Sequence, residues 1–382
     1  MRLPGITGGF PTGLRISTSA AQGIKLMRNR LLTTIIAIAA CTLTIVTPAM
    51  AEKKDHFRVA WSIYAGWMPW GYLNDHGILK KWADKYHITI DLVQLNDYIE
   101  SINQYTAGKF DGCGMATMDT LTIPAVGGVD TTILIMGDYS NGNDGIVLKT
   151  GKLVSDLKGQ KVNLVEFSVS HYLLARALNS VGLTEHDVKT VNTTESDGVA
   201  AFTGSGDIQN IVSWNPMLSD IKKVPGATLV FDSSKIPGEI MDVMAVNTQT
   251  LKDNPDFGKA LTGAWYEMLA LMNSGTPEAE KAIASMAAAS GTDVPGFKAQ
   301  LATTYLFNTP AETLKFEDPA ALKRIMDLVR TFSFEHGLLG QNAASKDVVG
   351  IEFPDGSTIG DPNNVKFRFD TKFTEMAAEG KL

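Results

Sequence analysis

Aromatic and acidic side chains gather in a few short stretches of this 382-residue chain. The densest stretch is RVAWSIYAGWMPWGYLND, residues 58–75, which holds three of the six tryptophans together with two tyrosines. Aromatic faces attract cations and stack on flat molecules, whereas buried aromatic side chains fill a core. Both interpretations stay open for this stretch, because its composition alone does not separate them.

Carboxylates are the second group of residues that could bind a ligand. The segments 61–79, 111–148, 166–171 and 193–221 contain acids and aromatics but no lysine or arginine. Anion sites favour cationic partners, although helix N-termini and backbone N–H groups also bind anions. A flat cation such as guanidinium would stack on an indole and fork onto carboxylates, whereas urea is flat but neutral. The acidic and aromatic residues of these segments include Trp61, Tyr64, Trp67, Trp70, Asp119, Asp138, Asp144, Glu166, Glu195, Asp197 and Trp214.

Alternating strands and helices must position these segments. The pattern predicts one α/β unit up to about Met136 and a second from about Lys161, which together indicate two lobes. In open α/β sheets the ligand lies beyond the carboxyl ends of the strands, where the acidic and aromatic segments fall. From Pro255 onward the pattern predicts helices, over 255–272, 277–286, 295–301 and 318–334. The predicted strands are 57–61, 88–95, 110–114, 132–136, 161–165, 188–191, 208–212 and 243–247, and the predicted earlier helices are 72–86, 97–107, 120–126, 170–181 and 196–203.

The first 51 residues differ from the rest of the chain. They carry five basic residues and no acid, and the apolar run 31–46 ends before Ala49-Met50-Ala51. This arrangement predicts a secretory signal peptide cleaved after Ala51, because the apolar run is shorter than the ~20 residues of a membrane span. Two alternatives stay open: translation from Met27, and lipid attachment at Cys41.

Charge and cysteine content narrow the class further. The 34 Lys and Arg residues face 41 Asp and Glu residues, and removing residues 1–51 takes away five of the basic ones, leaving a net charge of about −12. This surface argues against nucleic acid and anionic membranes as partners. Only Cys113 remains after cleavage, so an exported chain would have no internal disulfide, and Cys113 is expected in the core.

Four further stretches together carry a resemblance to a known family. They are TAGKFDGCGMATMDTL (106–121), DYSNGNDGIVLK (138–149), SDLKGQKVNLVEFSVSHYLLARAL (155–178) and DGVAAFTGSGDIQNIVSWNP (197–216). In this order they resemble the nitrate, sulfonate and taurine class of ABC-importer substrate-binding proteins. The aromatic YAGWMPWGY loop and the TMDTL and GGVD spacing look most like the subgroup found with urea carboxylase genes, whose members are thought to import urea or guanidine.

The resemblance implies a type II periplasmic-binding fold, with two α/β lobes around a ligand cleft. It implies residues 52–145 as the first part of lobe I, 146–242 as lobe II, and 243–382 as a return to lobe I plus C-terminal helices. It also implies a periplasmic receptor that delivers a small solute to a permease and its ATPase without catalysis. We expect a monomer that carries no cofactor and no metal, because the sequence contains no His/Cys cluster and no calcium loop.

The candidate ligand contacts are Tyr64, Trp67, Trp70, Asp119, Asp138, Glu166, Glu195 and Trp214. The resemblance supports the loop of Asp119, the position of Glu166 and the tryptophan at 214. Structural alternatives remain for each: Asp119 as a helix N-cap, Asp138 as a hinge residue, Glu195 as a cap, and the aromatics as core, which we expect for Trp61.

Two other functions stay open. The same fold could bind nitrate, a sulfonate or another anionic or neutral solute, with His171 at a helix start as a donor. An enzyme related to thiamin-pyrimidine synthesis is the less favoured alternative, because the acidic and aromatic segments offer only His171 and Cys113 without a nucleophile–base pair at readable spacing.

Overall fold

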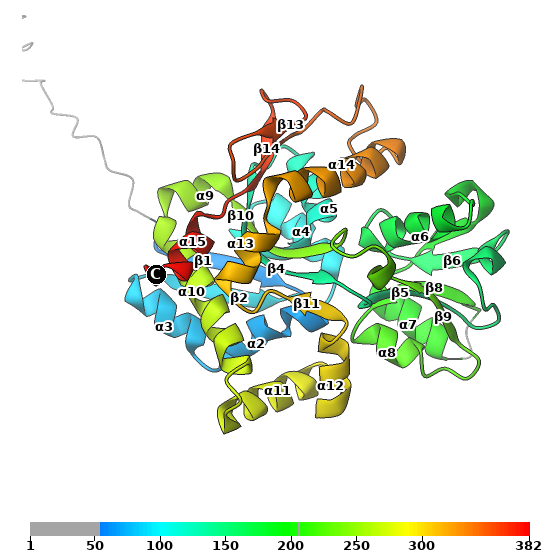
Figure 1. Cartoon of the computed structure of the whole chain (residues 1–382), viewed down its shortest axis with the longest axis horizontal. Helices are drawn as coiled ribbons and strands as arrows, with labels where there is room; N and C mark the ends of the chain where they lie inside the picture. Colours follow the sequence, from blue (N-terminus) through cyan, green and yellow to red (C-terminus); the bar gives the residue numbers. More distant parts are fainter. Residues whose placement is uncertain (1–53, 205–206) are drawn as a thin grey trace, which may run out of the picture. The chain divides into compact units, whose positions relative to one another are not determined.

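The computed structural model describes residues 54–204 and 207–382. The predicted signal peptide over residues 1–51, with the alternatives at Met27 and Cys41, lies outside the described residues. Within the described ranges the strands form two sheets with helices packed on them, a larger one and a smaller one (Figure 1). We call the larger sheet with its helices lobe I and the smaller sheet with its helices lobe II.

Lobe I contains a mixed sheet whose inner strands come from both halves of the chain. Its central pair is β4 with β10, which run antiparallel, and β1 pairs in parallel with β2 and β3. In spatial order the strands are β13 (Thr358–Ile359), β12 (Gly350–Glu352), β14 (Val365–Phe369), β4 (Thr131–Ser140), β10 (Met241–Asn247), β3 (Gly112–Ala116), β1 (His56–Trp61) and β2 (Thr89–Gln94), and β11 (Thr304–Leu306) also pairs with β4.

Lobe II contains the smaller sheet. The chain enters it between Ser140 and Asp144 and leaves it between Asp232 and Met241, so two crossings connect the lobes. Its strands in spatial order are β7 (Lys189–Asn192), β6 (Lys161–Leu164), β8 (Asn210–Trp214), β5 (Asp144–Leu148) and β9 (Thr228–Asp232). Its helices are α6 (Val169–Ser180), α7 (Glu195–Thr203) and α8 (Met217–Ile221).

The aromatic stretch after β1 is more regular than the sequence predicts. Gly66 and Pro69 indicated an irregular loop, but a short 3-10 turn, η1 (Ala65–Trp67), leads directly into α2 (Met68–Asp75). Pro69 is tolerated because it occupies the first turn, where its missing N–H has no intrahelical partner to lose. The single helix predicted over 72–86 is wrong, because Gly77 adopts φ +77° and separates α2 from α3 (Ile78–Lys85).

The segment around Asp119 also differs from the prediction. The helix expected to begin at Thr120 begins at Thr117, as α5 (Thr117–Thr120), and continues as a π-helical turn, η2 (Leu121–Ala125). Ala116 is the N-cap of α5, so Asp119 lies inside the helix and the N-cap interpretation of Asp119 is wrong. The preceding helix of lobe I is α4 (Tyr98–Thr106).

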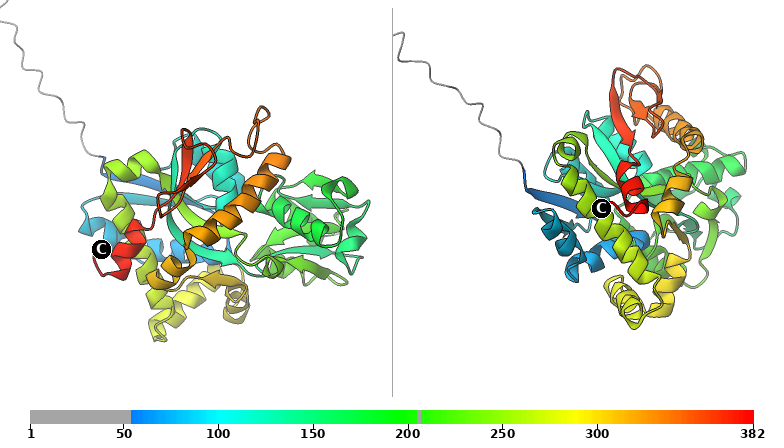
Figure 2. Two further views of the ribbon diagram at one scale, coloured as in Figure 1. Left: turned by 45° about the horizontal axis from the view of Figure 1, so that its top comes forward. Right: turned by 60° about the vertical axis from the view of Figure 1, so that its left-hand side comes forward.

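The C-terminal part of the chain contains strands as well as helices. We expected only helices after residue 247, but β14 joins the larger sheet in parallel with β4. Figure 2 shows α14 as the orange helix that runs diagonally across lobe I. The helices are α9 (Thr248–Asp253), α10 (Pro255–Met272), α11 (Pro277–Ala289), α12 (Val294–Leu301), α13 (Pro310–Phe316), α14 (Pro319–Glu335) and α15 (Lys372–Ala378).

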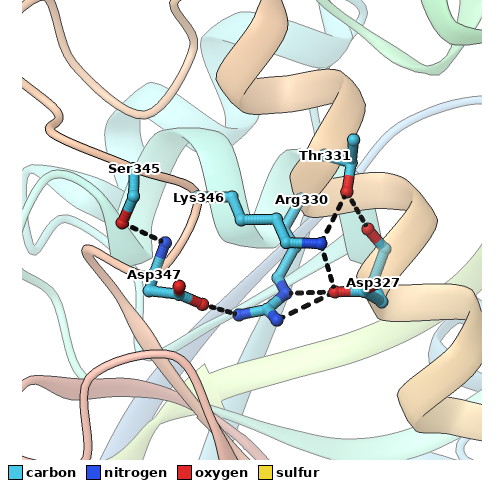
Figure 3. Close-up of polar contacts among 6 residues, drawn as sticks. All are labelled: Asp327, Arg330, Thr331, Ser345, Lys346 and Asp347. Carbon is cyan, nitrogen blue, oxygen red and sulfur yellow. Dashed lines mark hydrogen bonds and ion pairs between the residues drawn. The ribbon is translucent and has the colours of Figure 1, made fainter.

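A polar network fastens α14 to the loop that follows it (Figure 3). Arg330 donates to Asp327 on its own helix at 2.9 Å and to Asp347 on the loop at 2.6 Å. Lys346 donates to Asp327 at 2.8 Å and to Thr331 at 3.0 Å. The network holds the C-terminal half of α14 in place, and the ring of Phe332 from that half packs against Tyr172 of lobe II.

Among the described residues, no helix combines the length and the apolar character that crossing a membrane requires. The largest buried side chains are aromatic and include Trp70, Trp265, Tyr105 and Tyr172.

Candidate ligand-binding site between the lobes

A small cavity lies where the two lobes meet. It encloses about 20 Å³ of space for the centre of a water-sized molecule, and a single water needs roughly 10–15 Å³ by the same measure. In this arrangement of the lobes the cavity therefore has room for about one or two water molecules. Its lining residues are Ser62, Tyr64, Trp67, Tyr98, Ala116, Asp144, Val169, Trp214, Ile240 and Asp242.

Aromatic rings form the walls of this cavity. Trp67 contacts Tyr64 edge to face at a centroid distance of 5.0 Å and lies 5.9 Å from Tyr98. Tyr98 in turn meets Trp214 of lobe II edge to face at 6.0 Å. The indole Nε1 of Trp67 is buried and has no hydrogen-bond partner, so a ligand with an acceptor atom could satisfy it.

The end of β1 and the turn after it position the first wall. Tyr64 precedes η1, and its hydroxyl donates to Asp138 on β4 at 2.9 Å. A Cβ atom at position 66 would lie 2.4 Å from Asp138 Oδ2, so only glycine allows this close approach. The backbone N–H of Ala65 donates to Asn215 of lobe II at 3.2 Å, which ties the turn to the opposite lobe.

Two carboxyl groups line the cavity directly. Asp144, at the first residue of β5, accepts a hydrogen bond of 2.5 Å from Ser140, and burial raises the pKa of Asp144 to about 6. Asp242, on β10, is 5% exposed, and burial together with the charges of Asp138 and Asp144 raises its pKa. Neither acid contacts a lysine or arginine in any ion pair of the described chain.

A third carboxyl group lies immediately behind the lining. Asp138 is fully buried and is the direct cross-strand neighbour of Asp242 in the antiparallel pairing of β4 with β10. The two carboxyl groups are within hydrogen-bonding reach of each other, and burial raises the pKa of Asp138. The Oδ2 atoms of Asp138 and Asp242 meet no donor.

A fourth carboxyl group supports the second aromatic wall. The hydroxyl of Tyr98 donates to Asp119 at 2.5 Å and accepts from the backbone N–H of Ala116 at 3.0 Å. Asp119 is fully buried, its Oδ1 has no partner, and burial raises its pKa to about 7. Buried carboxylates without a basic partner are costly unless they bind a proton or a cation.

The predicted contacts occupy different positions relative to this cavity. Tyr64, Trp67 and Trp214 line it, while Asp119 and Asp138 lie one layer behind and hydrogen-bond to the lining tyrosines. Glu195 accepts from the backbone N–H of Tyr98 at 3.0 Å across the lobes and borders a smaller neighbouring cavity.

Two predicted contacts lie elsewhere. The indole of Trp70 is buried and stacks on Trp265 at 4.8 Å, outside the cavity lining. Glu166 is partly exposed, also outside the lining, and its backbone N–H donates to Asn192 at 3.0 Å.

Sequence reasoning missed three polar contributors to the cavity, Asp242, Tyr98 and Ser62. Asp242 is an acid among the apolar residues 241–246 of β10, and an acid in a buried strand is a signal that could have found it. Tyr98 falls within the predicted helix 97–107, where its helical spacing carries no sign of a ligand; the missed signal is a buried tyrosine whose hydroxyl needs a partner.

One group of side chains could hold a metal ion among the described residues: His171, Glu185 and His336. Glu185 Oε1 lies 3.0 Å from Nε2 of His171 and 2.5 Å from Nε2 of His336. The backbone N–H of Phe167 donates to Nδ1 of His171 at 3.1 Å, so a neutral His171 carries its proton on Nε2. A metal ligand would need that nitrogen unprotonated, so the group fits an ion pair between the lobes better than a metal site.

Comparisons with known proteins agree with the two-lobed architecture. The family model described as NMT1/THI5 like matches residues 80–274 of this chain. A protein of Escherichia coli (strain K12) named as an aliphatic sulfonates-binding protein is 30% identical over 164 residues, which are 43% of this chain and 48% of that protein. The match thus spans about half the length of that relative.

Solved structures show the same fold at low sequence identity. The alkanesulfonate-binding protein SsuA from Xanthomonas axonopodis pv. citri, bound to MOPS, has a TM-score of 0.63 and 16% identity, and the match covers 76% of this chain and 96% of that one. The periplasmic aliphatic sulphonate-binding protein SsuA of E. coli has a TM-score of 0.55 and 22% identity, with 72% and 94% covered. These matches confirm the predicted α/β periplasmic-binding-protein fold.

A nitrate-binding structure extends the comparison. The periplasmic nitrate-binding protein NrtA from Synechocystis PCC 6803 has a TM-score of 0.53 and 11% identity, and the match covers 85% of this chain and 99% of that one.

Proposed function

The chain belongs to the NMT1/THI5-like family, and on this premise we propose that it is the periplasmic solute receptor of an ABC importer whose ligand is a small planar nitrogen compound. Guanidinium is the first candidate and urea the second. The closed receptor would deliver the solute to a permease and its ATPase, and binding alone would suffice for this role without catalysis.

The observation that carries this proposal is the composition of the interlobe cavity. Asp144 and Asp242 line it, aromatic rings wall it, and none of its lining residues is a lysine or arginine. Aromatic faces contribute about 0.5–2 kcal/mol each to cation binding once water is excluded. A guanidinium ion would neutralise the buried carboxylates while its N–H groups satisfy their free oxygens.

The indole Nε1–H of Trp67 favours urea as the ligand. Guanidinium has only donors, so it leaves the buried Nε1–H of Trp67 without an acceptor, whereas the urea carbonyl could accept from it. An unsatisfied donor costs about 1–3 kcal/mol. We place guanidinium first because several buried carboxylates without a counter-charge cost more than one unpaired indole N–H.

A sulfonate or nitrate is the alternative that the names of the relatives suggest. A sulfonate or nitrate anion would lie against Asp144 and Asp242 with no basic residue in the cavity lining. His171, the donor considered from the sequence, instead faces Glu185. An enzyme related to thiamin-pyrimidine synthesis remains less favoured, because no histidine or cysteine lines the cavity.

Isothermal titration calorimetry of residues 52–382 tests the proposal. The panel is guanidinium chloride, urea, sodium nitrate and taurine, and tetramethylammonium is added because it is a cation without N–H donors. The expected order of affinity is guanidinium, then urea, with no measurable binding of nitrate or taurine. Tight binding of nitrate or taurine without guanidinium would refute the proposal, and preference for tetramethylammonium would refute the hydrogen-bonding part of it.

A further inference from the structure

Asp138 and Asp242 face each other across two neighbouring strands in a way that two carboxylates rarely do. They are directly opposite in the antiparallel register of β4 and β10, and they are 0% and 5% exposed. Like charges directly opposite on a sheet repel each other, and burial strengthens the repulsion because the surroundings screen less. Two ionised carboxylates in this position would be strongly destabilising without a compensating charge.

The surroundings of the pair supply only neutral donors or further acids. Tyr64 donates to Asp138 Oδ1 at 2.9 Å, and Asp144, an acid on the lobe II side that also lines the cavity, is itself bound by Ser140. Asp119 lies behind Tyr98, whose hydroxyl donates to it. No lysine, arginine or histidine is among the residues that line the cavity. A shared proton is therefore the simplest counter-charge for the pair in the absence of ligand.

We infer that the ligand-free receptor holds one proton between Asp138 and Asp242, and that a monovalent guanidinium-type cation takes its place. This inference rests on the proposed function, since it specifies how the same cavity selects the charge of its ligand. The exchange is balanced: the O–H bond of one carboxyl group breaks, the proton leaves to the solvent buffer, and the cation enters. The net charge of the cavity stays the same.

The exchange explains how one site can be stable both empty and filled. With the proton bound, the empty cavity avoids two adjacent buried charges, and with the cation bound both carboxylates are ionised and paired. A neutral ligand such as urea cannot replace the proton. The structure thus assigns Asp242, which the sequence analysis did not single out, the role of a charge-selecting residue.

Calorimetry in buffers of different ionisation enthalpy tests the exchange. At pH 7, guanidinium chloride is titrated into the mature protein in phosphate and in Tris, and the dependence of the observed enthalpy on the buffer gives the number of protons released. We expect about one proton per guanidinium bound and none with urea. Binding of guanidinium with the same observed enthalpy in both buffers, and hence no proton release, would overturn the inference and leave the receptor function intact.

Two variants and one control locate the proton. In Asp242→Asn or Asp138→Asn, the amide can donate to the remaining carboxylate, so guanidinium binding should release about one proton fewer than in the wild type. Asp75→Asn, which removes an exposed carboxylate at the end of α2, should leave the release unchanged. Unchanged release in both buried-site variants would overturn the assignment.

A ligand-independent measurement covers the case in which guanidinium does not bind. Infrared spectra of the empty protein at pH 7 should contain the carbonyl band of a protonated carboxylic acid, reduced in Asp242→Asn and in Asp138→Asn but not in Asp75→Asn. A spectrum identical in the wild type and both buried-site variants would overturn the shared proton. Failure of guanidinium to bind, with the band present, would instead refute the proposed ligand alone.

Discussion

Tyr98 and Asp119, 21 residues apart in the sequence, join through a hydrogen bond of 2.5 Å beneath the wall of the interlobe cavity. Tyr64 and Asp138 repeat the arrangement on the other side, at 2.9 Å. Each lining tyrosine is thereby fixed by a buried acid behind it. The acids hold the aromatic walls in place and bring negative charge close to the ligand.

Replacing Tyr98 by Phe tests this support. The ring remains as a wall, but Asp119 and the backbone N–H of Ala116 lose their partner, so we expect a loss of about 1–3 kcal/mol in the free energy of unfolding. Thermal unfolding is the suitable measurement, because urea and guanidinium are themselves candidate ligands. Tyr305→Phe, at a 48% exposed ring, is the matched control and should unfold like the wild type. Equal stability of both variants would contradict the role of the bond.

Trp67 and Trp70 should behave differently although they are three residues apart. Trp67→Ala removes a cavity wall and should weaken guanidinium binding by at least about tenfold. Trp70→Ala leaves a hole beside Trp265, so it should cost about 3–5 kcal/mol of stability, while the folded protein binds within about twofold of the wild type. Calorimetry and thermal unfolding of both variants decide this. If Trp67→Ala binds guanidinium as tightly as Trp70→Ala does, Trp67 contributes to packing and not to ligand binding.

Trp67→Phe distinguishes the two ligands. It keeps an aromatic face but removes the buried Nε1–H, so it should weaken urea binding more than guanidinium binding, since only urea has an acceptor. The ratio of the two affinities, measured by calorimetry in wild type and variant, is the readout. A ratio that does not change would contradict a hydrogen bond from Trp67 to urea.

Asp144 and Glu166 give a second matched pair. Asp144 lines the cavity, so Asp144→Asn should weaken guanidinium binding by at least about tenfold, because one buried charge partner is lost. Glu166 is partly exposed and outside the lining, so Glu166→Gln should bind within about twofold of the wild type. A loss of affinity confined to Glu166→Gln would move the site to the position that the family resemblance suggested.

The stability of the empty protein should fall as the pH rises. Burial raises the pKa of Asp119 to about 7 and that of Asp144 to about 6. A carboxyl group whose folded-state pKa is raised contributes fully at low pH, below its unfolded value, and loses this contribution as the pH rises through the folded-state pKa. For Asp119 alone the full loss, between its unfolded-state pKa and about 7, is on the order of 4 kcal/mol, of which roughly 3 kcal/mol falls above pH 5. Thermal unfolding from pH 5 to pH 8 should show it, and a midpoint that rises over this range would contradict it.

The contact between Glu185 and His336 has its own pH window. The two histidines hold the pKa of Glu185 down to about 2 despite its partial burial, and Glu185 raises the pKa of His336. The ion pair therefore stabilises the folded protein above the pKa that glutamate has in the unfolded chain. This stabilisation is lost as the pH rises through the folded-state pKa of His336. His336→Asn should lower the unfolding midpoint more at pH 5.5 than at pH 8.5. The reverse order would contradict the ion pair.

The sequence was informative where local pattern determines structure and less so where tertiary contacts do. The helix predicted over 255–272 is α10 with the same bounds, because Pro255 starts it and its apolar residues repeat at helical spacing. The C-terminal strands were missed because β14 is short and gains its partner, β4, from residues more than 200 positions earlier.

The candidate site was likewise predictable where it depends on local sequence and not where it depends on tertiary contacts. The absence of Lys and Arg from the acidic and aromatic segments was readable in the sequence, and the aromatic stretch contains two lining residues, Tyr64 and Trp67. Asp242 was recognisable in the sequence as an acid in a buried strand, but its nearness to Asp138 was not, because that depends on the register of β10 against β4. Trp70, from the same aromatic stretch, lies outside the cavity lining because it packs on Trp265, a partner almost 200 positions later in the chain.

A crystal structure of the mature protein grown with guanidinium chloride tests the central claim most directly. We expect one planar ion in the cavity between the lobes, flat against the ring of Trp67 or Trp214, with its nitrogens within hydrogen-bonding distance of Asp144 and Asp242. A guanidinium-free cavity at saturating concentration, or an anion held there instead, would contradict the proposal that this receptor selects a small planar cation.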